Sequence, residues 1–458
     1  MSLVLDVAEW AEQEFGSCKL GDVRRTRRAV KVATQMAAHP DGTTPQQTEK
    51  WGDLKSIYRL VDSESVTFTA LAEPHWQQTR ERATGVCLVI NDTTETDFGI
   101  HRHVDGLGPT GDGDGRGFFL HSALLVQAET GEVIGLAGQE LFYRKPTGRA
   151  NESSYKRTQR ARESEVWGRL IDRVGPPRED QKYLHVDDRG ADNFEVFCHL
   201  RQHRCGWIVR AAQLTRWVKT PDGRRVKLKE WLAKQPVLGT YKLTVRARKK
   251  ELPRTATLEV RAVQVTLIPP RRKTPYLRQI GPQEIPGWVV EAREVNPPKG
   301  ATPVRWVLYT SETADTFEQA WQILEYYELR WLIEEFHKSL KTGCRLESRQ
   351  YRTAGRLEAV AGILSVLAVR LLQLKQIALK QPEIPAERVV PRAWLSMLRK
   401  LRTRPIKTVR DFVRHLAGLG GFLMRKGDGE PGWITVWRGL DKLLLCLRGA
   451  YAARQRCG

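Results

Sequence analysis

Two short, mostly apolar runs, each followed by acidic residues, constrain the fold of this 458-residue chain more than any other feature. Val86–Ile90 leads to Asp92, and Tyr183–Val186 leads to Asp188. Apolar runs of this length are typical of strands buried on both faces, as in parallel sheets covered by helices. The sequence therefore predicts an α/β protein in which acidic residues follow two buried strands.

Hydrophobic periodicity divides the chain into three parts. Residues 1–84 are expected to form a helical N-terminal domain, residues 85–380 an α/β core, and residues 381–458 a helical C-terminal domain. Within the core, residues 213–311 are expected to form an inserted β-rich subdomain, because Lys242–Lys249 and Thr257–Leu267 alternate apolar residues with Lys, Arg and Thr in the strand period. The expected elements are helices from Val4 to Phe15, Asp22 to Met36, Gln46 to Val61 and Phe68 to Arg82, strands over 118–128, 133–143 and Trp207–Ala212, and helices over 152–173, 192–203, Phe317–Lys341 and Ala354–Lys380.

Asp92 and Asp188 each stand at the predicted carboxyl end of a strand, the edge of an α/β sheet where reactive groups collect. If the two strands are neighbours, the two carboxylates lie close enough to share a cation. Mg²⁺ would relieve their repulsion and accept their oxygens as ligands. For either Asp taken alone, a role as a turn residue or helix cap is the more common one, and that alternative stays open.

The predicted helix Phe317–Lys341 carries four polar residues on one narrow stripe. At about 100° per residue, Arg330, Glu334 and Lys341 lie within about 60° of Tyr327. The opposite side of this helix is apolar and consists of Leu329, Leu332, Ile333, Phe336 and Leu340. The helix is therefore expected to bury one face and to present a phenol, a guanidinium, a carboxylate and an ammonium on the other.

Two interpretations of this stripe remain open. Glu334 and Lys338 have the i, i+4 spacing of paired charges, which is typical of a solvated helix face. Tyr327 and Trp331 are bulky aromatic residues beside the charges, and they favour a partner that offers both stacking and phosphate. Sequence spacing alone does not decide between a solvated face and a binding face.

The charge balance favours a polyanionic partner. Lys and Arg total 75 against 53 Asp and Glu, which gives a net charge of +22 and a pI near 9.9. Nucleic acid is the first such partner to consider, while a merely soluble basic protein and a protein docked on anionic lipid are alternatives. The Arg-rich start of the second predicted helix, with Arg24, Arg25 and Arg28, favours DNA contact by the N-terminal domain.

Several features indicate the compartment. No uninterrupted apolar run reaches the ~18 residues that span a bilayer, and no secretory signal is visible at the start of the chain. The seven cysteines lack the spacing of a disulfide scaffold, which favours a reducing interior. No phosphate-binding Gly-Lys-Ser/Thr motif is present, so no nucleotide cofactor is expected. For a bacterial chain the expected location is the cytoplasm, on the nucleoid when bound to DNA.

Three strings of residues stand out together. They are Asp92-Thr93-Thr94, Asp188-Arg189 followed by Ala191-Asp192, and the pattern Tyr327-x-x-Arg330-x-x-x-Glu334-x-x-x-x-x-x-Lys341. With Leu20-Gly21-Asp22, Asn296-Pro297-Pro298-Lys299-Gly300 and the Trp306 segment, they resemble the DDE transposases of bacterial insertion sequences, most closely the Tn5 transposase. The third string is that family's YREK signature. The resemblance covers roughly residues 8–380.

This resemblance implies an RNase H-like core in which Asp92, Asp188 and Glu334 hold two Mg²⁺ ions, for which Mn²⁺ can substitute. Two ions about 3.5–4 Å apart can activate an attacking water or 3′-hydroxyl and stabilise the leaving oxygen of an in-line displacement. The implied reaction is DNA transposition: one strand is nicked, the new 3′-hydroxyl forms a hairpin, the hairpin is reopened, and the end is joined to target DNA.

The resemblance also implies double-stranded DNA as partner, as element ends and as target. It further implies a homodimer in the synaptic complex, paired through the C-terminal helices. The expected DNA contacts are Tyr327, Arg330, Lys341, Lys338, Trp306, Arg210, Arg189, Lys299, Arg24, Arg25 and Arg28. Of these, Trp306 is expected to stack on a base extruded near the cut, and Tyr327, Arg330 and Lys341 are expected to hold phosphates of the DNA end.

Two positions depart from the family's pattern. Gly190 stands where Glu often follows Asp-Arg, and Phe118-Phe119 stands where a bulkier aromatic pair is expected. Both concern how the flipped base or the hairpin is held. Two alternative functions remain: a catalytically silent repressor that binds the element ends, and a related metal-dependent nuclease that cuts without joining. The intact triad argues against the first, and the YREK string with the insertion argues against the second.

Overall fold

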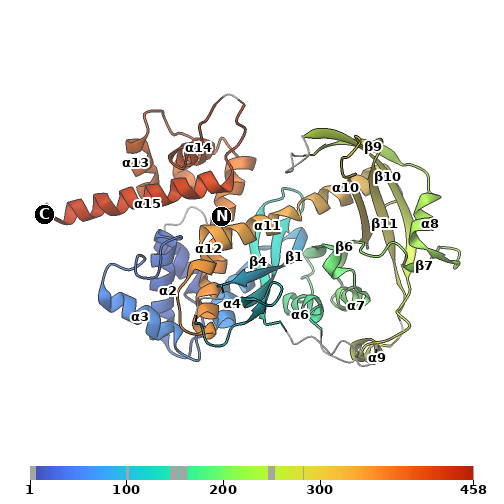
Figure 1. Cartoon of the computed structure of the whole chain (residues 1–458), viewed down its shortest axis with the longest axis horizontal. Helices are drawn as coiled ribbons and strands as arrows, with labels where there is room; N and C mark the ends of the chain where they lie inside the picture. Colours follow the sequence, from blue (N-terminus) through green and yellow to red (C-terminus); the bar gives the residue numbers. More distant parts are fainter. Residues whose placement is uncertain are drawn as a thin grey trace.

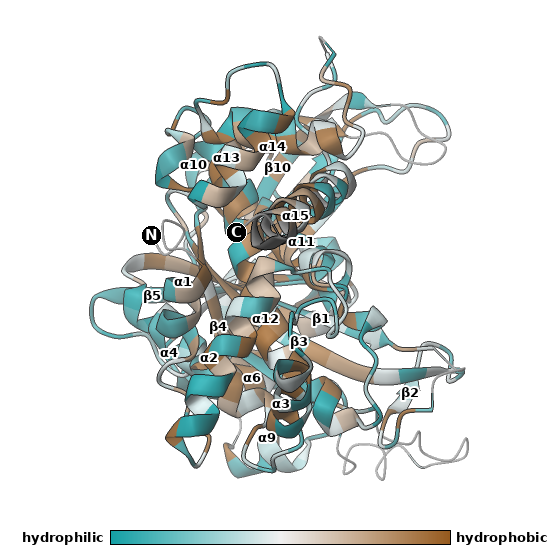
Figure 2. Ribbon diagram, turned by 90° about the vertical axis from the view of Figure 1, so that its left-hand side faces the viewer, coloured by the Kyte–Doolittle hydropathy of each residue, from teal (hydrophilic) through white to brown (hydrophobic). Residues whose placement is uncertain are grey.

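The computed structural model describes residues 7–99, 103–144, 153, 162–245, 253–281, 283–425 and 427–456. Over these residues the chain is a mixed α/β protein with one large sheet and helical flanks (Figure 1). Alternate residues of the central strands belong to two separate hydrophobic cores, one on each face of the sheet. Figure 2 shows the apolar residues of these strands and of the helices packed against them in brown.

Twelve strands are present in the described part of the chain, in the order β2-β3-β1-β5-β6-β12-β11-β10-β7-β8, with β4 beside β3 and β9 beside β10. They are β1 (Gly85–Asp97), β2 (Gly108–Thr110), β3 (Gly115–Gln127), β4 (Val133–Phe142), β5 (Gln181–Asp187), β6 (Gly206–Arg210), β7 (Trp217–Lys219), β8 (Arg225–Lys227), β9 (Gly239–Val245), β10 (Arg254–Leu267), β11 (Ile285–Glu294) and β12 (Arg305–Thr310). The buried strands predicted from the two apolar runs are therefore β1 and β5.

The β-rich residues 213–311 do not form a sheet of their own. β12 pairs antiparallel with β6, with Tyr309 opposite Val209, and β11 and β10 follow in the same sheet. The expected inserted segment is β-rich as predicted, but its strands extend the core sheet. The reason is that β6 has a free edge after β5 pairs with its other side, and β12 satisfies the backbone groups of that edge.

Four helices precede the sheet: α1 (Val7–Phe15), α2 (Val23–Ala38), α3 (Trp51–Val61) and α4 (Phe68–Arg82). Asp22 caps α2 as predicted, because its carboxylate accepts the backbone N–H of Arg24 at 2.8 Å. The expected start of the third helix at Gln46 is wrong. The side chain of Gln46 instead accepts the backbone N–H of Thr43 at 2.9 Å within a turn, and α3 begins only after it.

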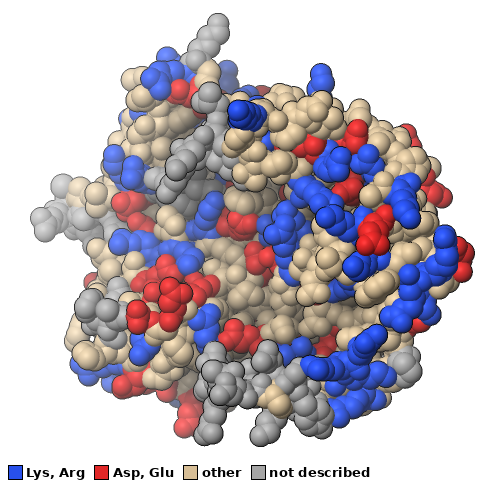
Figure 3. All heavy atoms as spheres, turned by 45° about the vertical axis from the view of Figure 1, so that its right-hand side comes forward, with Lys and Arg blue, Asp and Glu red and all other residues tan. Residues whose placement is uncertain are grey.

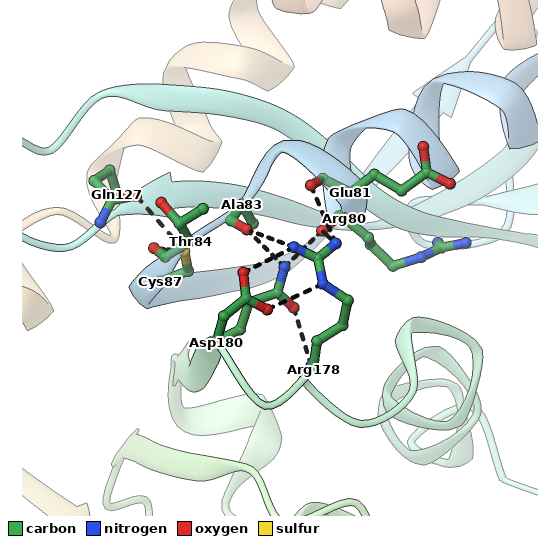
Figure 4. A network of polar contacts seen from close by, with 9 residues as sticks. Arg80, Glu81, Ala83, Thr84, Cys87, Gln127, Arg178 and Asp180 are labelled. Atoms are coloured by element: carbon green, nitrogen blue, oxygen red, sulfur yellow. Dashed lines mark hydrogen bonds and ion pairs between the residues drawn. The ribbon is translucent and has the colours of Figure 1, made fainter.

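The end of α4 is fixed to the core by Arg178 (Figure 4). Its guanidinium donates to the carbonyls of Arg80 at 3.3 Å, Glu81 at 3.1 Å and Ala83 at 3.3 Å. Gln181, the first residue of β5, donates to the carbonyls of Arg80 and Ala83 at 2.8 and 2.7 Å. These are carbonyls at or just beyond the last turn of a helix, which lack intrahelical partners. The contact sets how the N-terminal helices sit on β1 and β5.

The helix predicted over Phe317–Lys341 is divided. α10 (Phe317–Glu328) ends before a tight turn, α11 (Trp331–Lys338) follows, and the chain continues as a π-helical turn over Ser339–Gly343. The backbone N–H groups of Arg330 and Leu332 reach carbonyls only three residues back, at 3.0 and 2.9 Å. This tightening interrupts the α-helical period. Residues on opposite sides of the break therefore do not share one helix face in the way that their sequence spacing predicts.

The remaining helices flank the sheet or form the C-terminal region: α6 (Glu165–Val174), α7 (Phe194–Gln202), α8 (Leu228–Ala233), α9 (Pro275–Gln279), α12 (Ala354–Lys380), α13 (Arg392–Leu401), α14 (Val409–Leu419) and α15 (Trp433–Arg456). Of the charged helix expected over 152–173, residues 152 and 154–161 lie outside the described residues, and α6 begins at Glu165. The far end of α15 extends away from the rest of the protein (Figure 1).

α12 coincides with the helix predicted over Ala354–Lys380. It is long and apolar enough to cross a membrane, although polar and charged residues interrupt its apolar run. However, 83% of its most apolar 18-residue window is buried inside the protein. α12 packs against α4, β4 and the π-helical turn, and is therefore a core helix.

Candidate active site

β1 and β5 bring Asp92 and Asp188 to adjacent positions. The two strands are parallel neighbours, and their pairing ends with Asn91 opposite Asp187. Asp92 and Asp188 are therefore the residues that come directly after this last pair. Asp92 does not end its strand as predicted. Beyond the pairing with β5, β1 continues to Asp97 by pairing with β3, which is longer than β5. The position of Asp92 at the edge of the parallel pairing is the one that matters for the site.

Asp188 follows β5 directly and begins a short 3₁₀ turn over Arg189–Ala191. Its Oδ1 accepts the backbone N–H of Gly190 at 2.7 Å, so the turn holds one carboxylate oxygen. The structural alternative for this Asp is thus also realised, since it caps a turn. The two roles are compatible because a carboxylate has two oxygens and about four acceptor sites.

Glu334 reaches the same place from α11, which packs on β1. The guanidinium of Arg330 lies between the two acids. Its Nη1 is 3.4 Å from Asp92 Oδ2, and its Nη2 donates to Glu334 Oε1 at 2.7 Å. The side chains of Arg330, Asp92 and Glu334 are 17%, 21% and 30% exposed, so the ion pairs are only partly solvated. The carboxylates of Asp92 and Glu334, 242 residues apart in the sequence, therefore share the guanidinium of Arg330.

The pKa of Asp92 shows how crowded this site is. Burial, with the neighbouring charges of Asp188 and Glu334, raises the pKa of Asp92 to about 6. The backbone N–H of Thr93 and the guanidinium of Arg330 oppose this rise. An acid whose pKa is raised by other acids is repelled by them, and a bound cation would relieve that repulsion.

Among the residues that the structure describes, no three acidic, His or Cys side chains are grouped closely enough to hold a metal ion as they stand. Arg330 accounts for this at the present site, because it separates Asp92 from Glu334. The donor set itself suits a hard divalent cation: carboxylate oxygens, partly buried, with excess negative charge. A cation that takes the place of the guanidinium would meet the same two oxygens.

Tyr327 does not share an exposed stripe with Glu334, contrary to the prediction, because the helix breaks between them. It is only 5% exposed at the end of α10. Burial raises the pKa of Tyr327, while Arg210 and Arg330 oppose the rise. The ring of Trp306 on β12 meets the ring of Tyr327 edge-on, with centroids 5.8 Å apart. Tyr327, Trp306 and Arg210 thus lie together beside the acidic site, on neighbouring strands and α10.

The other predicted contacts lie on more open surface. Lys341, in the π-helical turn, pairs with Glu347 at 2.9 Å. The ammonium of Lys338 lies 4.9 Å from the ring centroid of Trp331, whose side chain is exposed. Arg189 and Lys299 are exposed. Lys and Arg cover much of the face drawn in Figure 3, most densely in its right-hand half.

The three predicted contacts on α2 also make internal contacts. Arg24 pairs with its own cap residue Asp22 at 3.0 Å, and Arg28 lies 3.4 Å from Asp53. Arg25 donates to the carbonyl of Leu20 at 3.1 Å. Arg24 and Arg25 are exposed, and Arg28 is half-buried. All three remain accessible to a partner at the start of α2.

Sequence analysis did not single out the buried polar residues behind the acids. Asp187 is fully buried, its Oδ1 accepts from Asn91 Nδ2 at 2.7 Å, and the same amide lies 3.1 Å from His185 Nδ1. Burial raises the pKa of Asp187 well above its usual range and lowers that of His185 to about 3. The one available signal was a polar residue at a strand position where the pattern is otherwise apolar.

Three family models match successive parts of the chain. The model described as "Transposase DNA-binding" matches residues 7–66, "Transposase DDE domain" matches residues 155–370, and "Transposase Tn5 dimerisation domain" matches residues 366–457. The second range contains Asp188 and Glu334, while Asp92 lies before it. The three descriptions concern one kind of protein, and they follow the order of the N-terminal helices, the sheet and the C-terminal helices.

Proposed function

Because the chain is a DDE transposase that resembles the Tn5 transposase, we propose that it cuts the ends of its element and joins them to target DNA. The DDE family in general is metal-dependent and breaks or transfers DNA strands. The proposed steps are nicking, hairpin formation, hairpin opening and strand transfer. One observation supports the proposal most directly: Arg330 bridges Asp92 of β1 and Glu334 of α11, and Asp188 follows β5 at the position beside Asp92.

The proposed catalytic core is RNase H-like and spans residues 85–380. The mixed sheet supports this assignment, with parallel β1, β5 and β6 flanked by antiparallel β3 and β4. Residues 1–84 are proposed as the DNA-binding domain and residues 381–458 as the dimerisation domain, in agreement with the order of the matches. Residues 213–311 form the insertion that lengthens the sheet.

Asp92, Asp188 and Glu334 are proposed to hold two Mg²⁺ ions, or Mn²⁺ in their place. When bound, these ions supply the charge that activates the attacking oxygen and stabilises the leaving one. The chain's own residues supply the rest. Arg330 can move from the two carboxylates to a DNA phosphate, since its planar guanidinium binds either kind of oxygen pair. Lys341 and Arg189 are proposed to neutralise further phosphates near the cut.

The proposed partners are DNA and a second copy of the chain, as the DNA-binding and dimerisation matches indicate. Trp306 is proposed to stack on an extruded base, because its indole lies beside Tyr327 and Arg210 at the edge of the acidic site. Lys299 and Lys338 are proposed to contact the same DNA, and Arg24, Arg25 and Arg28 to bind the element end. The proposed location is the bacterial cytoplasm.

Cleavage of a duplex that carries the element's own end tests this proposal. With Mg²⁺ and wild-type protein, a denaturing gel should show nicked, hairpin and excised products, followed by strand transfer. Glu334→Gln should abolish every product, whereas Glu335→Gln should keep them. Glu335 is a matched control on the same helix turn, since it pairs with Lys375 at 2.9 Å instead of facing Asp92.

Three other outcomes would overturn the proposal or part of it. Binding of the end without cleavage by the wild-type protein would favour the repressor that binds but does not cut. Cleavage without strand transfer would favour the nuclease. Equal loss in Glu334→Gln and Glu335→Gln would remove Glu334 from the catalytic triad.

A further inference from the structure

His121 on β3 is buried directly behind the acidic site. It stands opposite Thr93 in the β1–β3 register, and its Nδ1 lies 2.8 Å from Thr93 Oγ1. Its side chain has no solvent exposure. Thr93 follows Asp92, and successive side chains on a strand point to opposite faces. Asp92 therefore faces α11, while Thr93 and His121 lie on the face covered by α6 and α7.

Trp167 of α6 extends this contact toward the second acid. Its ring meets the imidazole of His121 edge-on, with centroids 4.4 Å apart. The same indole also lies against Gly190, in the turn that Asp188 begins. A Cβ at Gly190 would stand 3.1 Å from Trp167 Cζ2. The indole therefore fills the space between His121 and the backbone of this turn.

The absence of a side chain at Gly190 has a physical reason in this arrangement. A Cβ there would also lie 3.0 Å from Asp188 Oδ1, tighter than most contacts of its kind. The position that departs from the family's usual Glu is thus one where a Cβ would press against Trp167 and Asp188. Gly190 and Trp167 fit each other as a pair.

We propose that His121 and Trp167 form a brace that sets the separation of Asp92 and Asp188, so that both carboxylates can bind the same metal ions. The brace connects the residue after Asp92 to the turn after Asp188 across the back of the sheet. This inference rests on the proposed function, because it concerns how the same site binds its cation. His121 and Trp167 are positioning residues, since both lie on the face away from the acids.

The chemistry of the brace fits this role. Burial lowers the pKa of His121 to about 3, so the imidazole is neutral and adds no charge behind the acids. A neutral imidazole can accept the hydroxyl hydrogen of Thr93 through Nδ1 and so fix the Thr93 rotamer. The main chain at Asp92 is then held from behind. Residues that orient metal-binding side chains commonly contribute 10–100-fold to metal affinity.

Titration of Mn²⁺ into the full chain, followed by the electron paramagnetic resonance signal of free Mn²⁺, tests the brace without requiring catalysis. Trp167→Leu should weaken Mn²⁺ binding roughly tenfold. The matched control is Trp207→Leu. Trp207 lies in the same hydrophobic core, is 6% exposed against 7% for Trp167, and also meets an aromatic ring edge-on, that of Phe197. Its loss should change Mn²⁺ affinity less than about twofold.

A second pair of variants separates the hydrogen bond from general packing. His121→Leu should weaken Mn²⁺ binding as Trp167→Leu does, whereas His121→Asn should largely restore it, because an amide can still bond Thr93. Thermal melting and end-DNA binding confirm that each variant is folded. Equal affinities in Trp167→Leu and Trp207→Leu, or no rescue by His121→Asn, would overturn the brace.

Asp92→Asn and Asp188→Asn distinguish this inference from the function beneath it. Both should lose the tight Mn²⁺ site. If they keep it, the proposed metal site itself is wrong. If they lose it while His121→Leu and Trp167→Leu bind Mn²⁺ like the wild type, only the brace is wrong.

Discussion

At the scale of single residues, the site is a balance of charge between three acids and one arginine. Asp92 is repelled by Asp188 and Glu334 and attracted by Arg330, whose guanidinium takes the position that suits a cation. The raised pKa of Asp92 is the net result, because burial and repulsion outweigh the hydrogen bond from Thr93 and the charge of Arg330.

A first prediction concerns pH. The pKa of Asp92 rises from 3.8 to about 6, so between these values the folded protein binds the proton more tightly than the unfolded chain. Stability should therefore fall as pH rises through this window in EDTA. Asp92→Asn should remove the loss and be more stable near pH 7 by roughly 1–3 kcal/mol, since one pKa unit is about 1.4 kcal/mol and the side chain is partly solvated. Melting curves at pH 4 and pH 7 check this; a gap between variants that does not change with pH would contradict it.

A second prediction concerns Arg330. Arg330→Gln removes the guanidinium from between Asp92 and Glu334, so Mn²⁺ should bind the free protein more tightly. A charge-assisted hydrogen bond is worth about 1.5–3 kcal/mol, which corresponds to roughly tenfold or more in affinity. The same variant should bind end DNA more weakly. Calorimetric titration measures both, and unchanged Mn²⁺ affinity would show that the guanidinium does not compete with the ion.

At the scale of elements, two junctions place the site. The break between α10 and α11 turns Tyr327 inward beside Trp306 while leaving Glu334 over β1. The contact of Arg178 and Gln181 with the end of α4 fixes the N-terminal helices to the start of β1 and β5. Each junction depends on backbone groups that a regular helix leaves without partners.

The Arg178 junction can be tested directly. Arg178→Ala leaves the carbonyls of Arg80, Glu81 and Ala83 without this donor, so the melting temperature should fall by a few degrees and α4 should exchange amide hydrogens faster. Arg225→Ala, an exposed arginine on β8, is the control. Melting curves and hydrogen exchange of α4 measure the effect; a fall no larger than in the control would show that solvent replaces Arg178 without loss.

At the scale of the whole molecule, the net charge of +22 is spread over a surface that must accept a long polyanion. Such binding releases counterions, so affinity falls steeply with salt. The arginines at the start of α2 lie in the range matched by the DNA-binding family model. Each phosphate contact that is lost should lower the salt dependence by about one unit of slope.

Arg24 provides the test at this scale. Arg24→Ala removes the side chain that pairs with Asp22 but keeps the backbone N–H that Asp22 accepts, so α2 should remain capped. End binding should weaken, and the slope of log affinity against log salt should fall by about one unit. Filter binding at several salt concentrations gives the slope. An unchanged slope would remove Arg24 from the phosphate contacts.

Local signals in the sequence determined much of this protein. The extents of α4 and α12, the cap at Asp22 and the two buried strands all follow from periodicity, capping residues and apolar runs, which depend on neighbours a few residues away. The charge balance and the acidic strings also need no fold to be recognised. Strand ends predicted an acidic edge because the two strands were both of the buried, parallel type.

Only the tertiary structure decided which of these features meet. It made β1 and β5 neighbours, joined the β-rich segment to the core sheet, divided the expected helix at Arg330, and packed Trp167 between His121 and Gly190. Each of these depends on packing between residues far apart in the chain, where shape and buried polar groups outweigh local preference. A helical period continues through Leu329 and Arg330 in the sequence, but i, i+3 hydrogen bonds end it in the folded protein.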